Sequence, residues 1–531
     1  MKPAAKILKK VRRGVQTVAY GNPLYQKMLA SGEVPGRLHF TLPDLWPGDA
    51  RAGLALIGSQ RSLFESAAPL HPEAALRNLR AVGTDAARQT AVRIIENWLS
   101  RHDQWDDIEW APGAIGKRIA GWAGFYEFYA PAASSAFTAR LTSSLQKQYK
   151  HLMRTLTSEL TGVAGLCAIK GLVFGGLNFE EGEKALGIAC DLLKRQLTAE
   201  ILPDGGCISR CPSTQLHMLR HMIDLRTAFS VAAVETPEAA QTAITAMVPA
   251  LKFFRHGDGG LALFHGGLQE TALLIDAVIM QAGVKSRILR RLTNTGYERL
   301  TAGRGLLIAD CSRPPPEGYD QAGHAGLLSF EFSHGRERLI VNCGVPDGAT
   351  PEWRAACAAT AAHSTLTVED TNACEISESD GILCSAQVEA QRFEQDGAHC
   401  IEMMHDAYHS LFGLTYQRFL ALATDGEELR GRELLTSVSG RNFVLRWHLH
   451  PSVQASLTQG GRTTLLRMPS GAGWRLRVGG PGPDMRFAFG LEPSVYCGSG
   501  APRRSVVLKA SGRTNEGETI IDWSLAKEKK G

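Results

Sequence analysis

The sequence lacks the features that would assign the chain to a membrane, to a nucleic acid or to a disulfide-stabilised class. It has no run of about eighteen or more apolar residues, so it predicts no membrane-spanning helix. The formal net charge of +5 over 531 residues is too small to indicate a nucleic-acid partner. Of the eleven cysteines, only Cys207 and Cys211 are closely spaced, and we expect reduced, mostly buried thiols. A hydrophobic content of 44% and a charged content of 21% are typical of an ordinary soluble globular protein.

The N-terminal segment is basic, but it does not have the form of a secretory signal. Met1–Tyr20 reads MKPAAKILKKVRRGVQTVAY, without an apolar central region and without a small-residue cleavage site. On this basis we expect a cytoplasmic chain. Apolar residues recur at helical spacing among the lysines and arginines, which predicts a helical arm with a solvated basic face. A helix that lies on an anionic membrane is the alternative.

Two periodicities divide the rest of the chain, which is too long for a single core. From about residue 80 to 295, apolar residues recur at helical spacing, as in the stripe that starts at Phe137 and ends at Leu160. After Gly296 the period changes to two, in short segments bounded by Gly, Pro, Asn and Asp. We therefore expect an N-terminal arm with the first helices (1–79), a helical domain (80–295) and an antiparallel β-sandwich (296–531).

Three potential metal ligands stand at the ends of predicted strands. His324 comes just before the strand Leu327–Phe332, Asn342 just after its hairpin partner Arg338–Val341, and His363 at the start of the next strand. Ends of paired strands lie side by side, so we expect the three side chains to converge. Imidazole and amide groups fit one divalent ion, zinc or calcium, in the sandwich. A hydrogen bond to the sandwich backbone is the alternative role for His363.

The same run of sequence resembles the heparinase II/III-like polysaccharide lyases, in the segments GHAGLLSFEFSHGRERLIVNCG and WRAACAATAAHST. The loop ILPDGGCISRCPSTQ is similar to the Asp-Gly-Gly loop of that family, and the resemblance extends from about residue 80 to the end. It implies a helical α/α toroid (an incomplete barrel), then an antiparallel β-sandwich, with a His/Asp/His metal site near a carbohydrate cleft. Here Asn342 stands in place of the usual Asp.

The resemblance also implies β-elimination at a uronic acid, which requires a base, an acid and a group that neutralises the carboxylate. The residues that carry this chemistry in the family are replaced in this sequence. The Asn-His pair falls on Val163 and Ala164, the Tyr falls on Thr214, and the first His of the sandwich falls on Ala322. None of these side chains can replace an imidazole or a phenol in proton transfer.

Other residues near these motifs offer substitute catalytic groups. Arg210, in the Asp-Gly-Gly loop, can pair with a carboxylate in bidentate fashion, assisted by Gln215 as a neutral donor. His265, in a glycine-rich loop with His256 and Asp258, can act as a base near neutral pH. The alternative is that Arg210 caps a helix and that the histidines belong to a surface loop.

We assign substrate binding to Asp204 and Thr214 of the Asp-Gly-Gly loop and to Trp122, whose ring can stack on a sugar; core packing is the alternative for Trp122. The resemblance thus predicts a polysaccharide lyase that acts on an acidic, uronate-containing polysaccharide or oligosaccharide. The alternative is a catalytically degenerate glycan-binding or envelope-polysaccharide assembly protein of the same fold. Members of the family are often periplasmic or in the cell envelope, which differs from the cytoplasmic expectation.

Overall fold

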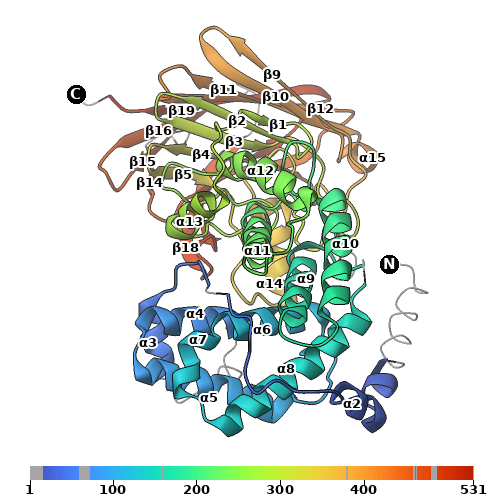
Figure 1. Ribbon diagram of the computed structural model, residues 1–531. Coiled ribbons are helices and arrows are strands. Elements are labelled where there is room, and N and C mark those ends of the chain that lie inside the picture. Colours follow the sequence, from blue (N-terminus) through green and yellow to red (C-terminus); the bar gives the residue numbers. More distant parts are fainter. Residues whose placement is uncertain are drawn as a thin grey trace. The chain divides into compact units, whose positions relative to one another are not determined.

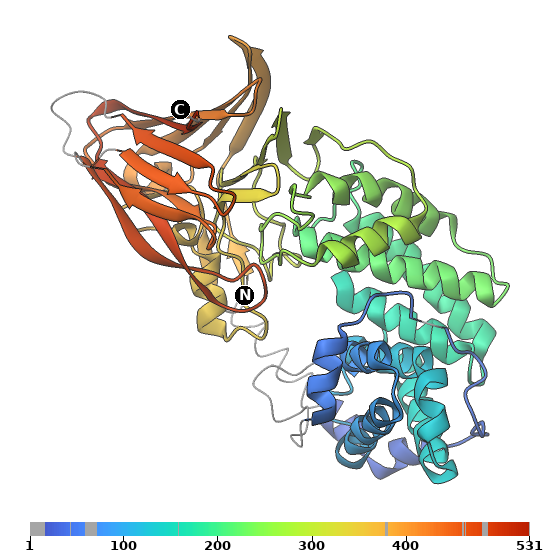
Figure 2. The ribbon, with the colours of Figure 1, turned by 90° about the vertical axis from the view of Figure 1, so that its left-hand side faces the viewer.

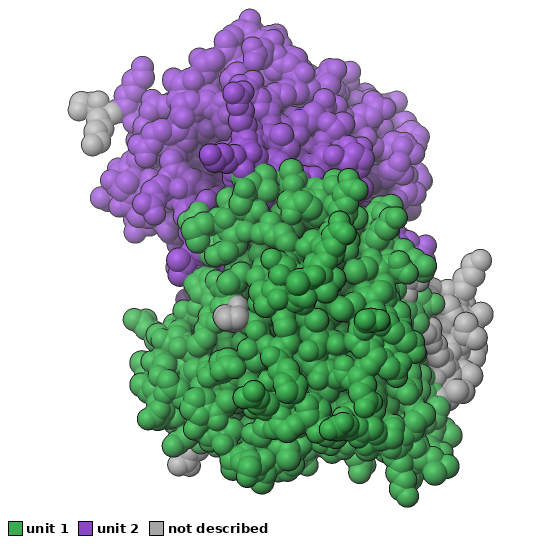
Figure 3. All heavy atoms as spheres, in the orientation of Figure 1, with its two compact units in different colours: residues 1–200, 217–245, 276–284 green, residues 201–216, 246–275, 285–531 purple. Residues whose placement is uncertain are grey.

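The structure divides the chain into two units, each with its own internal packing. It is a computed structural model that describes residues 16–42, 44–58, 72–157, 159–377, 381–458, 461, 463–479 and 487–529. Unit 1 comprises residues 1–200, 217–245 and 276–284, and unit 2 comprises residues 201–216, 246–275 and 285–531 (Figure 3). Most of the predicted basic arm, residues 1–15, lies outside the described residues.

Helices make up most of the chain before residue 285 (Figures 1 and 2, blue to green). Their bounds are α2 (Pro23–Leu29), α3 (Ala50–Gly58), α4 (Pro72–Val82), α5 (Asp85–His102), α6 (Pro112–Gly124), α7 (Tyr126–Tyr129), η1 (Ala130–Ala132), α8 (Ser135–Thr155), α9 (Gly162–Gly176), α10 (Gly182–Glu200), α11 (Pro212–Val231), α12 (Glu238–Phe253) and α13 (Ala272–Ala282). Among the described residues, no helix is both long and apolar enough to cross a bilayer. The predicted stripe is wrong at Leu160, because Leu156 takes an extended conformation that ends α8.

Glycines allow α6 and α9 to pack backbone against backbone in unit 1. A Cβ atom at Gly116 has no room beside the carbonyl of Cys167, and one at Gly171 has none beside the backbone of Gly116. A larger residue at either position would therefore push the two helices apart. This contact fixes α9, whose first turn carries Val163 and Ala164.

A group of buried charges joins the helices of unit 1. The ammonium group of Lys170 (α9) lies 3.1 Å from a carboxylate oxygen of Asp224 (α11) and 3.7 Å from one of Glu73 (α4). The indole N–H of Trp46 donates to Asp224 at 2.9 Å. Burial by itself raises the pKa of Glu73, but Lys170, Arg77 and other nearby cations outweigh it and hold that pKa well below its ordinary value. Lys170 thus offsets the charge of Asp224 and shares Glu73 with Arg77, whose guanidinium lies 2.9 Å from that carboxylate.

Strands follow, and the described ones form two large antiparallel sheets and one hairpin. The first sheet has the order β1-β2-β3-β4-β5-β13-β18-β17, with β6 also paired to β13, and the second has the order β14-β15-β16-β19-β12-β11-β10-β9. The strands of the first sheet are β1 (Arg291–Leu292), β2 (Tyr297–Ala302), β3 (Gly305–Asp310), β4 (Phe330–His334), β5 (Glu337–Val341), β6 (Leu366–Val368), β13 (Asn442–Leu449), β17 (Phe487–Tyr496) and β18 (Arg503–Arg513).

The second sheet contains β9 (Val388–Gln395), β10 (Ala398–His405), β11 (Leu414–Ala423), β12 (Glu428–Ser437), β14 (Gln454–Leu457), β15 (Thr463–Arg467), β16 (Gly473–Val478) and β19 (Gly517–Lys527), and the hairpin is β7 (Glu375–Ser377) with β8 (Gly381–Leu383). Short helices α14 (Pro351–Ala358), η2 (Thr360–Ala362) and α15 (His409–Phe412) lie in the connections. The described chain thus consists of helices in its first part and antiparallel strands in its second part, which confirms the predicted fold class.

The sandwich core contains one large hydrophobic cluster with side chains from both sheets. Phe330 of β4 stacks on Trp523 of β19, with ring centroids 5.9 Å apart. The buried pair Arg418–Glu433 crosses this core, and Arg418 donates to the carbonyl oxygens of Leu328 and Ser364, both at 2.8 Å. The predicted strand Leu327–Phe332 is wrong at its start, because Leu328 has a left-handed backbone (φ 56°) and β4 begins only at Phe330.

Candidate functional site

A line of buried polar side chains in unit 2 contains four of the predicted site residues. Arg210 donates to Asp310 Oδ1 at 2.5 Å, and Asp310 Oδ2 lies 3.2 Å from His265 Nε2. The backbone N–H of His324 donates to His265 Nδ1 at 3.1 Å, and His324 Nδ1 lies 2.9 Å from His363 Nε2. Each of the five residues is at most 5% exposed. The structure therefore brings Arg210, His265, His324 and His363 together around an aspartate that the sequence analysis did not single out.

Burial decides the charge state of the three histidines. It lowers the pKa of His265 and of His324, and it lowers that of His363 to about 4. Burial alone raises the pKa of Asp310, but the charge of Arg210 outweighs it and the net shift is downward. Near neutral pH the line thus holds one ion pair, Arg210–Asp310, and three neutral imidazoles.

Hydrogen bonding assigns the tautomers of the histidine pair. His363 Nδ1 lies 2.9 Å from the carbonyl oxygen of Ala359, which can only accept, so Nδ1 carries the proton. His363 Nε2 is then an acceptor, and His324 Nδ1 donates to it. This leaves Nε2 of His324 as the unprotonated nitrogen of the pair.

Arg210 is held by the protein itself. It sits in a left-handed backbone conformation (φ 55°), and its guanidinium donates to the carbonyls of Thr295 (2.6 Å), Gly296 (3.2 Å) and Arg313 as well as to Asp310. The ring of Tyr297 covers the guanidinium carbon at 4.9 Å. In this geometry Arg210 ties the Asp-Gly-Gly loop to the first strands of the sandwich. Most of its N–H groups already donate hydrogen bonds within the protein.

The other residues of the Asp-Gly-Gly loop also hold the backbone. Asp204 accepts from the N–H groups of Asn294 (2.7 Å) and Thr295 (2.8 Å), and Gln215 is fully buried. The Gln215 side chain accepts from the N–H of Cys207 at 2.7 Å and donates to the carbonyl of Gly205 at 2.8 Å. Thr214, in the first turn of α11, is half-buried.

Trp122 belongs to unit 1, where it is 1% exposed and packs edge-to-face on Trp98 with ring centroids 5.3 Å apart. This buried environment is that of a residue in core packing, the alternative role that the sequence suggested for Trp122. Sugar stacking by Trp122 stays a prediction that would need a different ring exposure.

Asn342 uses both ends of its amide on the backbone. Its Nδ2 donates to the carbonyl of Leu263 at 3.1 Å, and its Oδ1 accepts from the N–H of Ser364 at 3.1 Å. Two of the three predicted metal ligands, His324 and His363, therefore lie in contact. The side-chain amide of the third, Asn342, makes hydrogen bonds to the backbone at both ends. In the described part of the chain, no group of three or more His, Cys, Asp or Glu is arranged to hold an ion. Metal binding by this set stays a prediction.

A second buried carboxylate, also missed by the sequence analysis, anchors the glycine-rich loop. Glu331 of β4 is fully buried, lies 3.0 Å from His256 Nε2 and accepts from the N–H groups of Leu263 (3.1 Å) and Asn342 (3.0 Å). The sequence did contain a sign of both carboxylates. Asp310 is the one charged residue of the segment GLLIAD, and Glu331 is the one charged residue of SFEF, although both segments are otherwise typical of buried strands.

Comparison with known proteins places this geometry in a family. Residues 284–524 match the model of the heparinase II/III-like C-terminal domain. The FtsZ-localized protein C of Caulobacter vibrioides is 31% identical over 513 residues, which cover 90% of this chain and 85% of that protein. The chain therefore belongs to the heparinase II/III-like family.

Solved structures show the same fold at low identity. A crystal structure of heparinase III is similar with a TM-score of 0.69 and 11% identity, over 100% of this chain and 92% of that one. The heparan sulfate lyase HepC of Pedobacter heparinus gives a TM-score of 0.60 and 14% identity, over 98% and 91% of the two chains. These likenesses confirm the predicted helical toroid and antiparallel sandwich.

Proposed function

We propose that this chain is a catalytically degenerate member of the heparinase II/III-like family that works as a binding and assembly protein. The observation that carries the proposal is the buried Arg210–Asp310–His265 line. These are the groups that could have replaced the family's acid, base and carboxylate partner, and they are engaged with one another and with the backbone. A guanidinium already paired with an internal carboxylate is a poor clamp for a uronate, because the internal pair must break first.

The relative supports a location shared with FtsZ. Its name describes a protein localized with FtsZ, and it is similar along nearly the whole chain. We propose the same location for this protein. A fluorescent fusion should then gather where FtsZ gathers, and a fusion that stays dispersed while FtsZ is assembled would contradict this part of the proposal.

An acidic polysaccharide or oligosaccharide is the ligand class that the family suggests. Calorimetric titration of the purified protein with acidic glycans, together with an assay for unsaturated product, distinguishes a glycan-binding protein from a lyase. Binding without product formation supports the proposal, and product formation contradicts it.

A uronate lyase is the second candidate, and one observation favours it. The neutral His324–His363 pair presents an unprotonated Nε2 on His324, and such a nitrogen can accept a proton. If this nitrogen were the base, replacing His324 with Gln would remove product formation while leaving glycan binding in place.

A further inference from the structure

Two free cysteines of unit 2, Cys374 and Cys384, flank the hairpin β7–β8. The register of the hairpin pairs Glu375 with Leu383, and continued outward by one residue it sets Cys374 opposite Cys384. Residues opposite each other in an antiparallel pair have Cα atoms about 4.5–5.5 Å apart, within the range of about 4.4–6.8 Å that disulfides span. The two thiols are already in hydrogen-bond contact. The backbone therefore holds them where a disulfide can form without a large rearrangement.

The two thiols of this pair differ in exposure and in acidity. Cys374 is 4% exposed, whereas Cys384 is half-buried. The hydrogen bond from Cys374 lowers the pKa of Cys384 against the effect of burial, and the Ala386 backbone and Arg313 lower it further. The same hydrogen bond raises the pKa of Cys374, and burial adds to the rise. Because the thiolate is the reactive form, Cys384 is the nucleophile of the pair, and Cys374 stands beside it as a thiol.

Another group of thiols in unit 2 is more deeply buried. Cys357 is in hydrogen-bond contact with Cys343 and Cys497, and each of these three residues (the buried thiol group) is at most 6% exposed. The hydrogen bond with Cys343 raises the pKa of Cys357 to about 12, so this thiol stays protonated. Cys190 of α10 is half-buried like Cys384, but burial raises its pKa. Reaction with a small oxidant in solvent is thus favoured at Cys384.

Strand β8 packs on the loop that leads to His324. The carboxylate of Asp320 accepts from the N–H of Ile382 at 3.1 Å. The side chain of Ile382 is buried and lies against Gly323, where a Cβ atom would come within 3.0 Å of it. A covalent bond that fixes β8 would therefore also restrain the residues just before His324.

The segment before β7 is connected to the other side of His324. The N–H of Ala373 donates to Thr360 Oγ1 at 2.8 Å. The hydroxyl of Thr360 in turn donates to the carbonyl oxygen of Ala325 at 2.6 Å. The two cysteines thus stand on segments that contact the neighbours of His324 on both sides.

We propose that Cys374 and Cys384 are an oxidisable dithiol site at which a hydroperoxide forms an intrachain disulfide. The thiolate of Cys384 attacks one peroxide oxygen, so an S–O bond forms and the O–O bond breaks. The other oxygen leaves as hydroxide and takes up the proton that Cys384 had lost. The sulfur of Cys374 then attacks the sulfenic sulfur of Cys384, the S–S bond forms, and the hydroxyl group leaves as water with the thiol proton of Cys374. Two thiols and one hydrogen peroxide thus give one disulfide and two waters.

The disulfide restrains the segment around His324, because it joins the two strands that hold this segment. Closing the loop covalently removes conformations from the locally opened state, so opening becomes less frequent. The site acts in the same way whether or not the protein cleaves glycans. Its test is therefore separate from the test of the proposed function.

Disulfide mapping of the full-length protein tests the site. The reduced protein is freed of reductant and treated with a stoichiometric amount of hydrogen peroxide. Remaining thiols are alkylated, and glutamyl endopeptidase then cuts after Glu375, between the two cysteines. The peptides that contain Cys374 and Cys384 should be recovered cross-linked and should separate on reduction. Recovery of both cysteines as alkylated thiols, or a disulfide within the buried thiol group in their place, would overturn the proposal.

Variants distinguish the attacking thiol from the resolving one. Cys374→Ala should leave Cys384 as a sulfenic acid that dimedone labels, because no neighbouring thiol resolves it. Cys384→Ser should show no dimedone label at Cys374. Cys190→Ser, which removes a half-buried thiol from unit 1, is the matched control and should form the disulfide as the parent does. Circular dichroism checks the fold of each variant. Should Cys374→Ala not fold, a label at Cys374 in Cys384→Ser would by itself overturn the assignment of Cys384 as the nucleophile.

Hydrogen–deuterium exchange tests the restraint. The N–H groups of Ala325, Ala373 and Ile382 each donate a hydrogen bond in this region, to Ala358, Thr360 and Asp320. Peptides that contain these N–H groups should exchange about tenfold more slowly in the oxidised protein than in the reduced one. The difference should vanish in Cys384→Ser. Equal exchange in the oxidised and reduced parent would overturn the proposed restraint.

Discussion

Arg210 donates a hydrogen bond to Asp310 Oδ1 at 2.5 Å, and neither side chain is more than 5% exposed. The pair joins the Asp-Gly-Gly loop to the end of β3, and the second oxygen of Asp310 faces His265. A buried ion pair stabilises a fold only when both partners are present, because a lone buried charge is strongly unfavourable. The pair thus ties the Asp-Gly-Gly loop to β3 inside the fold.

Asp310→Asn should lower the free energy of unfolding by about 3–5 kcal/mol, because it leaves the buried guanidinium of Arg210 without its counter-charge. Urea denaturation followed by tryptophan fluorescence measures the loss. Asp522→Asn is the matched control, since Asp522 pairs with Arg432 on the surface, where both are more than half exposed. That variant should cost at most about 1 kcal/mol. Equal losses in the two variants would contradict a buried pair.

His363 should make stability depend on pH between about 4 and 6.5. Its folded-state pKa of about 4 lies below the ordinary histidine value of about 6.5, so in this window the unfolded chain binds a proton that the folded chain does not. Stability is then full above this window and decreases as the pH falls through it. His324, whose pKa is also lowered, contributes in the same direction.

The His363→Gln variant removes one of these protons. Urea midpoints measured across this pH window should therefore give a shallower slope for the variant than for the parent, whatever the variant's stability at neutral pH. A slope equal to that of the parent would show that His363 is protonated in the folded state or exposed to solvent.

Lys170→Met should destabilise unit 1 by about 3–5 kcal/mol, because Asp224 then loses its ion-pair partner while remaining buried, whereas Glu73 keeps Arg77 at 2.9 Å. Lys184→Met, the control, removes an exposed ion pair between Lys184 of α10 and Glu181. It should change stability by no more than about 0.5 kcal/mol. Chemical denaturation of the two variants measures the difference. A small loss in Lys170→Met would mean that water reaches the carboxylates.

Asn342→Asp should raise the affinity for zinc by adding a negative charge beside His324 and His363. Elemental analysis after dialysis against a chelator should find more retained zinc in this variant than in the parent. The double variant Asn342→Asp with His363→Ala should lose the gain. Equal zinc content in all three proteins would remove the predicted metal site.

Much of the fold follows from local pattern. Helical spacing up to about residue 295 and alternation after Gly296 are visible in the sequence, because each element buries one face. The misplaced boundaries have local causes that periodicity does not report. Leu156 ends α8 by adopting an extended backbone, and Leu328 delays β4 by adopting a left-handed one.

Four residues of the candidate site were predicted from the sequence, but its buried carboxylates and most of its connections were not. Arg210 and His265 were singled out separately, and His324 was expected to lie near His363. The structure joins Arg210 to His265 through Asp310, and His265 to the histidine pair through the backbone N–H of His324. A sequence shows that a residue is charged, whereas its partner depends on which loop packs on which strand. Asp310 and Glu331 were overlooked because they sit in strands that read as hydrophobic.

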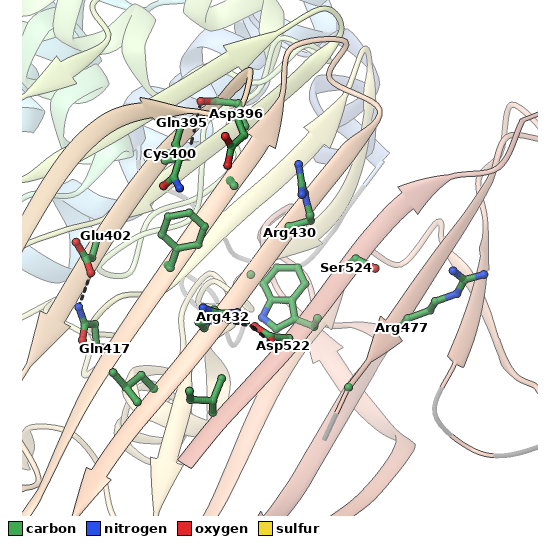
Figure 4. A pocket seen from close by; sticks show the side chains of 18 residues that line it. Gln395, Asp396, Cys400, Glu402, Gln417, Arg430, Arg432, Arg477, Asp522 and Ser524 are labelled. Atoms are coloured by element: carbon green, nitrogen blue, oxygen red, sulfur yellow. Dashed lines mark hydrogen bonds and ion pairs between the residues drawn. The ribbon is translucent and has the colours of Figure 1, made fainter. Parts of the chain in front are cut away.

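The second sheet shows the same limit. Arg430, Ser524 and Arg477 are far apart in the sequence and become neighbours only through the pairing of β12, β19 and β16 (Figure 4). Alternation predicts that each faces solvent, but only the register places them in one row.

The measurement that tests the central claim most directly is the ultraviolet absorbance of unsaturated uronate during incubation of the purified protein with a panel of acidic glycans, including heparan sulfate and polyuronates. Our account predicts no increase above the enzyme-free control for the parent, for Arg210→Lys or for His265→Gln. An increase with the parent that is lost in His265→Gln or Arg210→Lys would contradict it, because the buried Arg210–Asp310–His265 line would then be catalytic.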